Sequence, residues 1–157
     1  MAQDDDKDKL ISDANKAKDE FMKADALMKN LFDNSVGYVI FPNVGKGAIG
    51  VGGAAGNGIL YEQGNAVGKA KMKQVTVGFQ FGGQAYREII FFENKAALDQ
   101  FKAGHFELSA QASAVAATKG AAANVKYRNG IMIFTQEKGG LMYEASVGGQ
   151  KFGYNAL

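Results

Sequence analysis

Apolar residues in the N-terminal part of the chain recur at alternating spacings of four and three positions. Because an α-helix turns once every 3.6 residues, this spacing gathers them on one side of a helix. The pattern predicts a helical arm over residues 7–33, preceded by a disordered tail over residues 1–6. The apolar face of the arm consists of Leu10, Ala14, Ala17, Phe21, Ala24, Met28 and Leu31. Such a face either packs on the protein's own sheet or docks onto a membrane or a partner protein.

From residue 36 onward the apolar pattern changes to a period of two, which is typical of β-strands. An Asn57-Gly58 turn is expected to join the second and third strands, because Asn-Gly favours a tight hairpin. The predicted strands cover residues 38–41, 48–55, 59–63, 66–74, 75–82 and 85–92.

The remaining segments predict one helix and further strands. A short central helix over residues 94–103 has Asn94 as its cap and Gly104 at its end. Residues 106–118 favour a strand over a helix. The last hairpin is expected from residues 131–136 and 141–154.

Composition divides the chain where the periodicity changes, since all 21 glycines follow residue 36. The arm needs a surface for its apolar face, so arm (7–33) and glycine-rich β body (36–157) are expected to form a single domain over residues 7–157. We therefore predict an α+β fold: a strongly bent, barrel-like antiparallel sheet with a long N-terminal helix and a short central helix.

Charge is also divided. Residues 1–35 hold nine acidic residues and six lysines, a net charge of −3, whereas residues 36–157 hold seven acidic and twelve basic residues, a net charge of +5. The chain has no cysteine, which excludes disulfides, thiolate metal sites and a cysteine nucleophile.

The segment from Gly45 to Gly50 has the glycine spacing of a dinucleotide-binding loop. That motif requires a following helix whose N-terminus meets the phosphates. The further glycines up to Gly56 would cost such a helix several kcal/mol, at roughly 1 kcal/mol each relative to alanine. We therefore interpret Gly45 to Gly58 as β-structure of a binding protein.

The sequence has few of the residue arrangements that form catalytic or metal-binding sites. The one histidine, His105, follows the short helix, and the carboxylates of the β body are dispersed. We predict no enzyme, no cofactor and no metal site. A hydrolase centred on His105 stays an alternative that requires a polar pocket around it.

Three lysines at alternate positions form the most informative basic feature. In a strand, Lys69, Lys71 and Lys73 stand on one face, roughly 6–7 Å apart, with Ala70 and Met72 toward the core. The row either protects a solvated sheet edge or attracts phosphate groups such as anionic lipid headgroups. Nucleic acid is not expected, because no exposed aromatic ladder accompanies the basic residues. Residues that could extend the row are Lys46, Lys119, Lys126 and Arg128.

Several segments resemble the SYLF domain family. They are GYVIFPNV at 37–44, KGAIGVGG at 46–53, GILY at 58–61, QVTVGFQ at 74–80, GGQAY at 82–86 and KGGLMYEAS at 138–146. The resemblance covers residues 27–154, in order and at the family's spacing.

The resemblance implies a lipid-binding module, since eukaryotic relatives bind phosphoinositides at the membrane–actin interface and bacterial relatives are typically exported and bind phospholipid. We expect non-catalytic binding of anionic phospholipid at a membrane surface by an exported, periplasmic protein of the stand-alone bacterial type. The alternative is a protein-interaction module, similar to an actin-binding module or specific for an envelope partner, that docks through the amphipathic arm. The family assigns no individual ligand-contact residue here.

Overall fold

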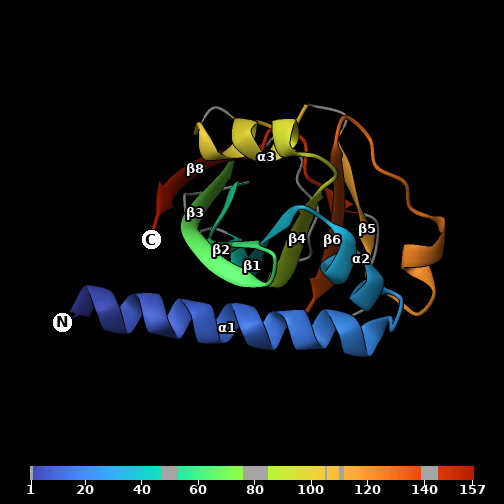
Figure 1. The fold of residues 1–157 in the computed structure, drawn as a ribbon, viewed down its shortest axis with the longest axis horizontal. Helices are drawn as coiled ribbons and strands as arrows, with labels where there is room; N and C mark the ends of the chain where they lie inside the picture. The colour runs from blue at the N-terminus through green and yellow to red at the C-terminus, as the bar shows by residue number, and fades with distance from the viewer. Residues whose placement is uncertain (1, 47–52, 76–84, 105, 110–111, 139–144) are drawn as a thin grey trace.

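The computed structural model describes residues 2–46, 53–75, 85–104, 106–109, 112–138 and 145–157. A long helix lies across one side of a strongly bent sheet, and a short helix lies on the opposite side (Figure 1). The helices are α1 (Ala2–Ala24), α2 (Met28–Asn34), α3 (Lys95–Lys102) and the 3₁₀ helix η1 (Ala121–Asn124). The strands are β1 (Gly37–Lys46), β2 (Gly53–Glu62), β3 (Asn65–Val75), β4 (Tyr86–Phe92), β5 (Ser113–Ala116), β6 (Ile131–Glu137), β7 (Ala145–Ser146) and β8 (Lys151–Ala156).

The strands form one sheet in the order β7-β5-β6-β4-β1-β2-β3-β8. All pairs are antiparallel except β5 with β6, which is parallel. The sheet bends around an apolar interior without closing into a barrel. The predicted α+β class with a bent sheet is confirmed, and the parallel pair corrects the expectation of a purely antiparallel one.

Apolar side chains fill both faces of the sheet, because successive residues of a strand point to opposite sides. On the convex face Tyr38, Ile40 and Ile59 pack beneath α1 and α2. On the concave face Val39, Leu60 and many aromatic rings pack beneath α3. Alternate residues of β1 therefore belong to two separate apolar layers, one on each face of the sheet.

The arm is two helices rather than one. Helix α1 begins at Ala2, so residues 2–6 extend it instead of forming a disordered tail; acidic residues at a helix start are favoured by the backbone dipole. The helix ends because the buried carboxylate of Asp25 accepts a hydrogen bond from the backbone N–H of Leu27 at 3.1 Å. Its second oxygen accepts one from Ala122 N–H of η1 at 2.8 Å, which ties the break to the far end of the sheet.

The glycines of β2 correct the predicted Asn57-Gly58 hairpin. Strand β2 continues through these residues, and the actual turn to β3 lies at Gln63-Gly64, where both residues have positive φ. A Cβ on Gly58 would stand 2.6 Å from the carbonyl oxygen of Ile40, so this position must be glycine for β1 and β2 to approach. Close strand packing therefore overrides the local turn preference.

The C-terminal prediction was wrong in its pairing. Strand β6 pairs with β4 and β5, whereas β8 pairs with β3 at the other end of the sheet. Among the described residues of the strand expected over 106–118, only β5 is regular, and residues 106–108 instead hydrogen-bond along β8. The short central helix is confirmed as α3, with the Asn94 side chain accepting a hydrogen bond from Ala97 N–H. The strand predicted at 75–82 lies mostly outside the described residues.

Candidate functional site

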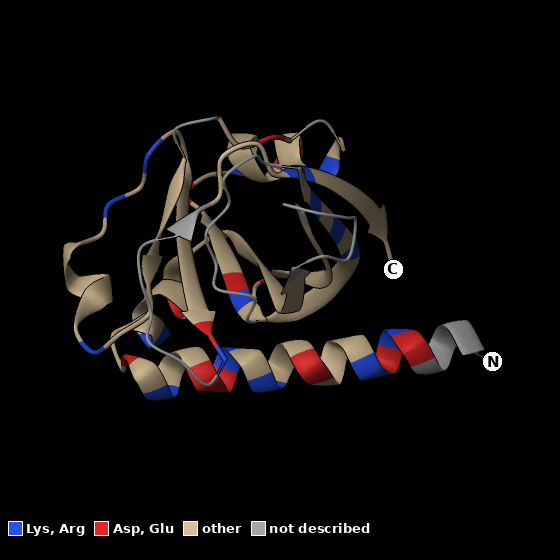
Figure 2. Ribbon diagram, turned by 180° about the vertical axis from the view of Figure 1, so that it is seen from behind, with Lys and Arg blue, Asp and Glu red and all other residues tan. Residues whose placement is uncertain are grey.

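The lysine row has the predicted arrangement. Ala70 and Met72 are buried, whereas Lys71 and Lys73 are exposed and Lys69 is half-buried. The strand register adds a fourth basic residue, because Lys151 of β8 lies directly opposite Lys73. In Figure 2 basic positions follow one another along the strands next to the C-terminus, whereas α1 carries charges of both signs.

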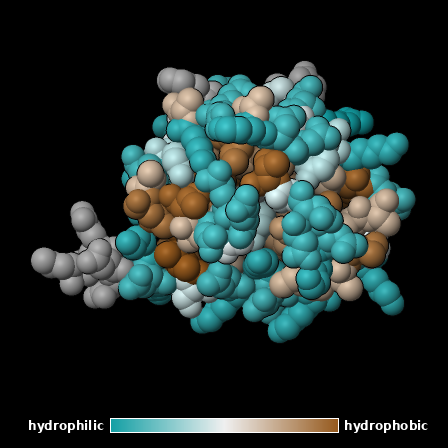
Figure 3. All heavy atoms as spheres, in the orientation of Figure 1, coloured by the Kyte–Doolittle hydropathy of each residue, from teal (hydrophilic) through white to brown (hydrophobic). Residues whose placement is uncertain are grey.

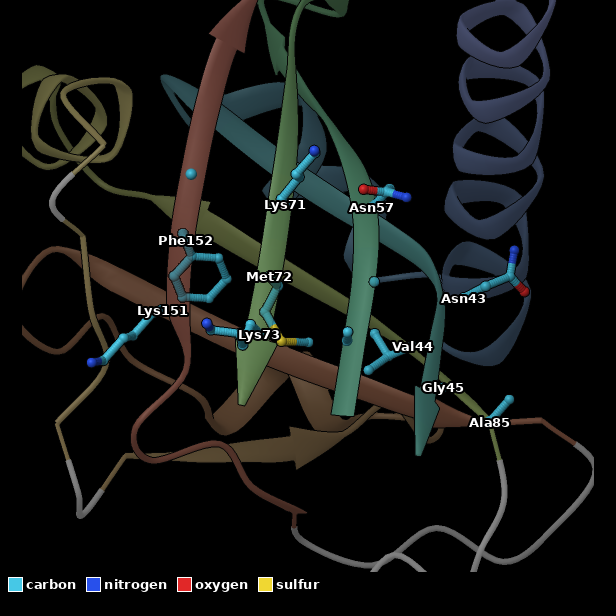
Figure 4. Close-up of a pocket in the computed structure, with 13 residues that line it drawn as sticks. Asn43, Val44, Gly45, Asn57, Lys71, Met72, Lys73, Ala85, Lys151 and Phe152 are labelled. Carbon is cyan, nitrogen blue, oxygen red and sulfur yellow. The ribbon is translucent and has the colours of Figure 1, made fainter. Parts of the chain in front are cut away.

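An open hollow of about 820 Å³ is lined by residues of β1, β2, β3 and β8 and by Ala85. Lys71, Lys73 and Lys151 stand around it together with Asn57 of β2 and Asn43 of β1 (Figure 4). Its remaining lining is small or apolar: Val44, Gly45, Ala55, Gly56, Met72, Ala85, Phe152 and Gly153. The hollow thus joins a basic rim to an apolar wall.

Glycine keeps part of this hollow open. Gly153 lies opposite Lys71 and Gly45 lies opposite Ala55, and a Cβ at either glycine would meet no atom within 4 Å. Larger side chains at these positions would occupy the space beside the lysines.

The rim lysines are not neutralised within the described part of the chain. Lys71, Lys73 and Lys151 have no ion pair there, although five other pairs are present. Like charges directly opposite each other in a sheet repel, so Lys73 and Lys151 cost some stability. An anion in the hollow would relieve that repulsion.

Other predicted basic residues are not brought to the hollow. Lys69 lines a separate, smaller hollow with Asp6, Lys9 and Asp13 of α1, in which two acidic residues balance two lysines. Lys126 and Arg128 are exposed next to β6, which is separated from β3 by β4, β1 and β2. Lys119 is exposed between β5 and η1, also in that half. The side chain of Lys46 lies outside the description.

The predicted apolar face of the arm is occupied. Phe21 and Met28 are fully buried against the sheet, and Leu10 and Leu31 are half-buried around them. Polar contacts fix the same packing, because Lys18 Nζ donates to the Tyr38 hydroxyl at 2.9 Å and the Tyr61 hydroxyl donates to Asn15 Oδ1 at 2.7 Å. In this conformation the face is not available to a membrane or a partner.

A buried polar cluster lies on the concave face beside the hollow. Gln150 Nε2 donates to Glu88 Oε1 at 2.8 Å and contacts Gln74 Oε1 at 3.3 Å, and Gln74 Nε2 donates to the Gly148 carbonyl at 3.1 Å. Thr135 lies opposite Glu88 in the β4–β6 pair. All four side chains are fully buried. Glu88 alternates along β4 with Tyr86, Ile90 and Phe92, which are buried on the concave face. This period of two could have predicted that Glu88 also points to the concave face.

Burial dominates the electrostatics of this cluster. It raises the pKa of Glu88 to about 7, and the hydrogen bond from Gln150 opposes that rise. Burial, followed by the nearby Glu88, also raises the pKa of Tyr86. The pKa of Glu88 therefore lies near neutrality, against an ordinary value of 4.5 for a glutamate side chain.

The described residues contain no group of three or more His, Asp or Glu side chains arranged to hold a metal ion. None of the helices described is both long and apolar enough to cross a bilayer. His105, the residue on which the hydrolase alternative rested, lies outside the described residues. The face seen in Figure 3 is largely hydrophilic, with smaller apolar groups.

Together these features define a small α+β domain whose bent sheet carries an open, basic-rimmed hollow. Residues 73–155, more than half of the chain, match the family model described as "Ysc84: Las17-binding protein actin regulator". The chain is also 30% identical over 127 residues to "Beta cell expansion factor A" of Aeromonas veronii, which covers 79% of this chain and 48% of that relative. The chain thus spans about half the length of this relative. It belongs to the SYLF family, as the sequence segments had suggested.

Proposed function

We propose that this domain is a non-catalytic module that binds anionic phospholipids at a membrane surface. The observation that carries the proposal is the hollow itself, in which three exposed lysines without ion pairs in the described chain surround an open space. Phosphate groups are the natural counter-ions for such a rim, since each lysine near an anionic membrane surface contributes about 1 kcal/mol.

The apolar wall extends the proposal from a phosphate to an amphiphile. Val44, Met72 and Phe152 line the hollow and belong to the concave core. Its volume of about 820 Å³ falls within the range of roughly 300–1,000 Å³ that is common for small-ligand sites. These three side chains are buried on the other side of the sheet from the lysines, so the start of an acyl chain would lie against the small residues that share the lysines' face, such as Ala55 and Gly153.

Co-sedimentation with vesicles tests the proposal. The wild type is expected to bind phosphatidylglycerol vesicles at low salt and to release them at high salt, and to bind phosphatidylcholine vesicles weakly. The triple variant Lys71→Glu, Lys73→Glu, Lys151→Glu should bind on the order of 100-fold more weakly or worse, since removing three contributions of about 1 kcal/mol already has that effect.

A control with the same charge change separates a local site from general attraction. The variant Lys119→Glu, Lys126→Glu, Arg128→Glu alters three exposed basic residues in the other half of the sheet. It should retain most of the binding. Equal losses in both variants, or no wild-type binding at low salt, would overturn the proposed site.

Protein binding is the second candidate, favoured by the description of the family model as a Las17-binding protein and actin regulator. Its surface would differ from the one first expected, because the apolar face of the arm is buried. Co-sedimentation with filamentous actin tests this candidate. Binding that survives the Lys71, Lys73 and Lys151 substitutions would favour a protein partner on another surface.

We further propose that the protein is exported to the periplasm of a bacterium and is peripheral to the membrane. The support is the resemblance of the sequence segments to the stand-alone bacterial type of SYLF domain, which implies export. Fractionation of cells that express the full-length gene tests it, and recovery with the cytosol alone would contradict it.

A further inference from the structure

The buried cluster lies directly behind the basic rim. Gln74 follows Lys73 in β3, and Gln150 precedes Lys151 in β8. The two lysines are paired across the strands, and the two glutamines contact each other through the amide of Gln150 at 3.3 Å. Each glutamine points inward while its neighbouring lysine points outward, so the inner contact fixes the backbone that carries both charges.

Three atoms of the cluster, Gln150 Oε1, Glu88 Oε2 and Thr135 Oγ1, lack among the described residues the partner that burial demands. Gln150 Nε2 donates to Glu88 Oε1, but Gln150 Oε1 and Glu88 Oε2 have no hydrogen-bond partner among the described residues. Both atoms are acceptors if Glu88 is ionised, and a buried unsatisfied polar atom costs about 1–3 kcal/mol. A proton on Glu88 Oε2 supplies the missing donor, because a neutral carboxylic acid and a primary amide can each donate one hydrogen bond to the other.

We propose that Glu88 is protonated when this domain binds an anionic ligand, and that its reciprocal pairing with Gln150 holds Lys73 and Lys151 in register at the rim. Glu88 and Gln150 are positioning residues, since they act through the backbone of β8 and touch no ligand. This inference rests on the proposed function and adds proton-linked regulation to it.

The surroundings of Glu88 support a neutral acid. The opposite residues are Phe41 of β1 and Thr135 of β6, and the concave neighbours on β3 and before β8 are Gln74 and Gln150. Tyr86 on the same strand is the ionisable group of the described residues that faces it, and no lysine or arginine is among these neighbours. Burial without a cation raises the pKa of Glu88 to about 7, which places its ionisation within the range that cells experience.

Ionisation of Glu88 would leave Glu88 Oε2 and Gln150 Oε1 both as acceptors, so neither could donate a hydrogen bond to the other. The pairing with Gln150 would then become one-sided, and the contact that fixes the start of β8 would weaken. The result is a rim whose lysines are less well placed for one phosphate. Anion binding should therefore be stronger at pH 5.5 than at pH 8.0, and ligand binding should in turn favour the protonated form.

Vesicle binding as a function of pH tests the inference. Phosphatidylglycerol vesicles are used because a phosphodiester keeps its charge from pH 5.5 to 8.0, and all proteins carry His105→Gln to remove the one histidine that titrates in this range. The protein that carries only His105→Gln should lose affinity for the vesicles about fivefold or more between pH 5.5 and pH 8.0. Glu88→Gln keeps a neutral side chain that can pair with Gln150, so its affinity should stay at the pH 5.5 value throughout.

A second variant keeps the test decisive. Gln150→Met has a similar volume but no amide, and at pH 5.5 it should bind as weakly as the protein that carries only His105→Gln does at pH 8.0. If vesicle affinity changes with pH in the same way with and without Glu88→Gln in the His105→Gln protein, the inference is overturned and the proposed function stays intact. Absence of vesicle binding at both pH values would instead refute the proposed function. If Glu88→Gln does not fold, a carbon-13 NMR titration of Glu88 in the unsubstituted protein decides, and a midpoint below pH 5 would refute the inference.

Discussion

Replacing Glu88 with glutamine should flatten the dependence of stability on pH. The pKa of Glu88 is about 7 in the folded protein against an ordinary value of 4.5. A carboxyl group whose pKa is raised by folding contributes stability that is fully present below pH 4.5 and is lost as the pH rises to about 7. The folded wild type therefore becomes less stable on going from acidic to neutral pH through this one group.

The magnitude follows from the difference between the two pKa values. At about 1.4 kcal/mol for each pH unit, the total contribution is about 3 kcal/mol, of which about 2.5 kcal/mol falls between pH 5 and pH 8. Because Glu88 is fully buried, solvent does not screen this effect. Glu88→Gln has no ionisable group at this position. Its free energy of unfolding should therefore rise by about 2.5 kcal/mol relative to that of the wild type between pH 5 and pH 8.

Urea unfolding followed by circular dichroism at pH 5, 6, 7 and 8 measures the effect. The difference between the unfolding free energies of the two proteins, rather than either value alone, isolates Glu88 from other titrating groups. Glu93→Gln, at an exposed glutamate just beyond the same strand, is the matched control for the loss of one carboxylate. A difference between Glu88→Gln and the wild type that is constant with pH would refute a neutral buried Glu88.

Three further predictions concern stability and are checked by the same unfolding measurements. Phe21→Ala should lose about 3–5 kcal/mol, because the ring is fully buried between α1 and the sheet; a loss below about 1 kcal/mol would mean that the arm detaches easily. Gly58→Ala should lose about 1–3 kcal/mol, because its Cβ would clash with the Ile40 carbonyl, whereas Gly153→Ala should be within about 0.5 kcal/mol of the wild type. Asp25→Ala should lose about 2–3 kcal/mol by leaving two backbone N–H groups without their acceptor, and Asp25→Asn should recover part of that loss.

Much of the α-helical part could be predicted from sequence alone. Ala14, Ala17, Phe21 and Met28 are buried as their spacing indicated, because helical periodicity depends only on neighbours three and four positions away. The break at Asp25 was missed. A short polar residue inside a helical pattern favours local capping, but the N–H group of Ala122 that completes its hydrogen bonding is 97 positions away.

The hollow was predicted only in part. Strand alternation alone indicated that Lys71 and Lys73 share a solvent face. It gave no sign of Lys151, whose place opposite Lys73 depends on the pairing of β3 with β8 rather than of β6 with the C-terminal segment. Lys126 and Arg128 were expected to extend the row, and strand order instead separates them from it.

Sequence pattern was enough to identify the helical and strand periods, the two faces of the arm and of β3, and the family resemblance. The tertiary structure alone decided which strands meet, why Gly58 is a packing residue rather than a turn residue, and that Gln74 and Gln150, 76 positions apart, lie together beside Glu88. The physical reason is the range of the interactions involved. Periodicity is fixed by contacts between near neighbours, whereas strand order and a buried polar cluster depend on which distant segments bury the most apolar surface while satisfying one another's hydrogen bonds.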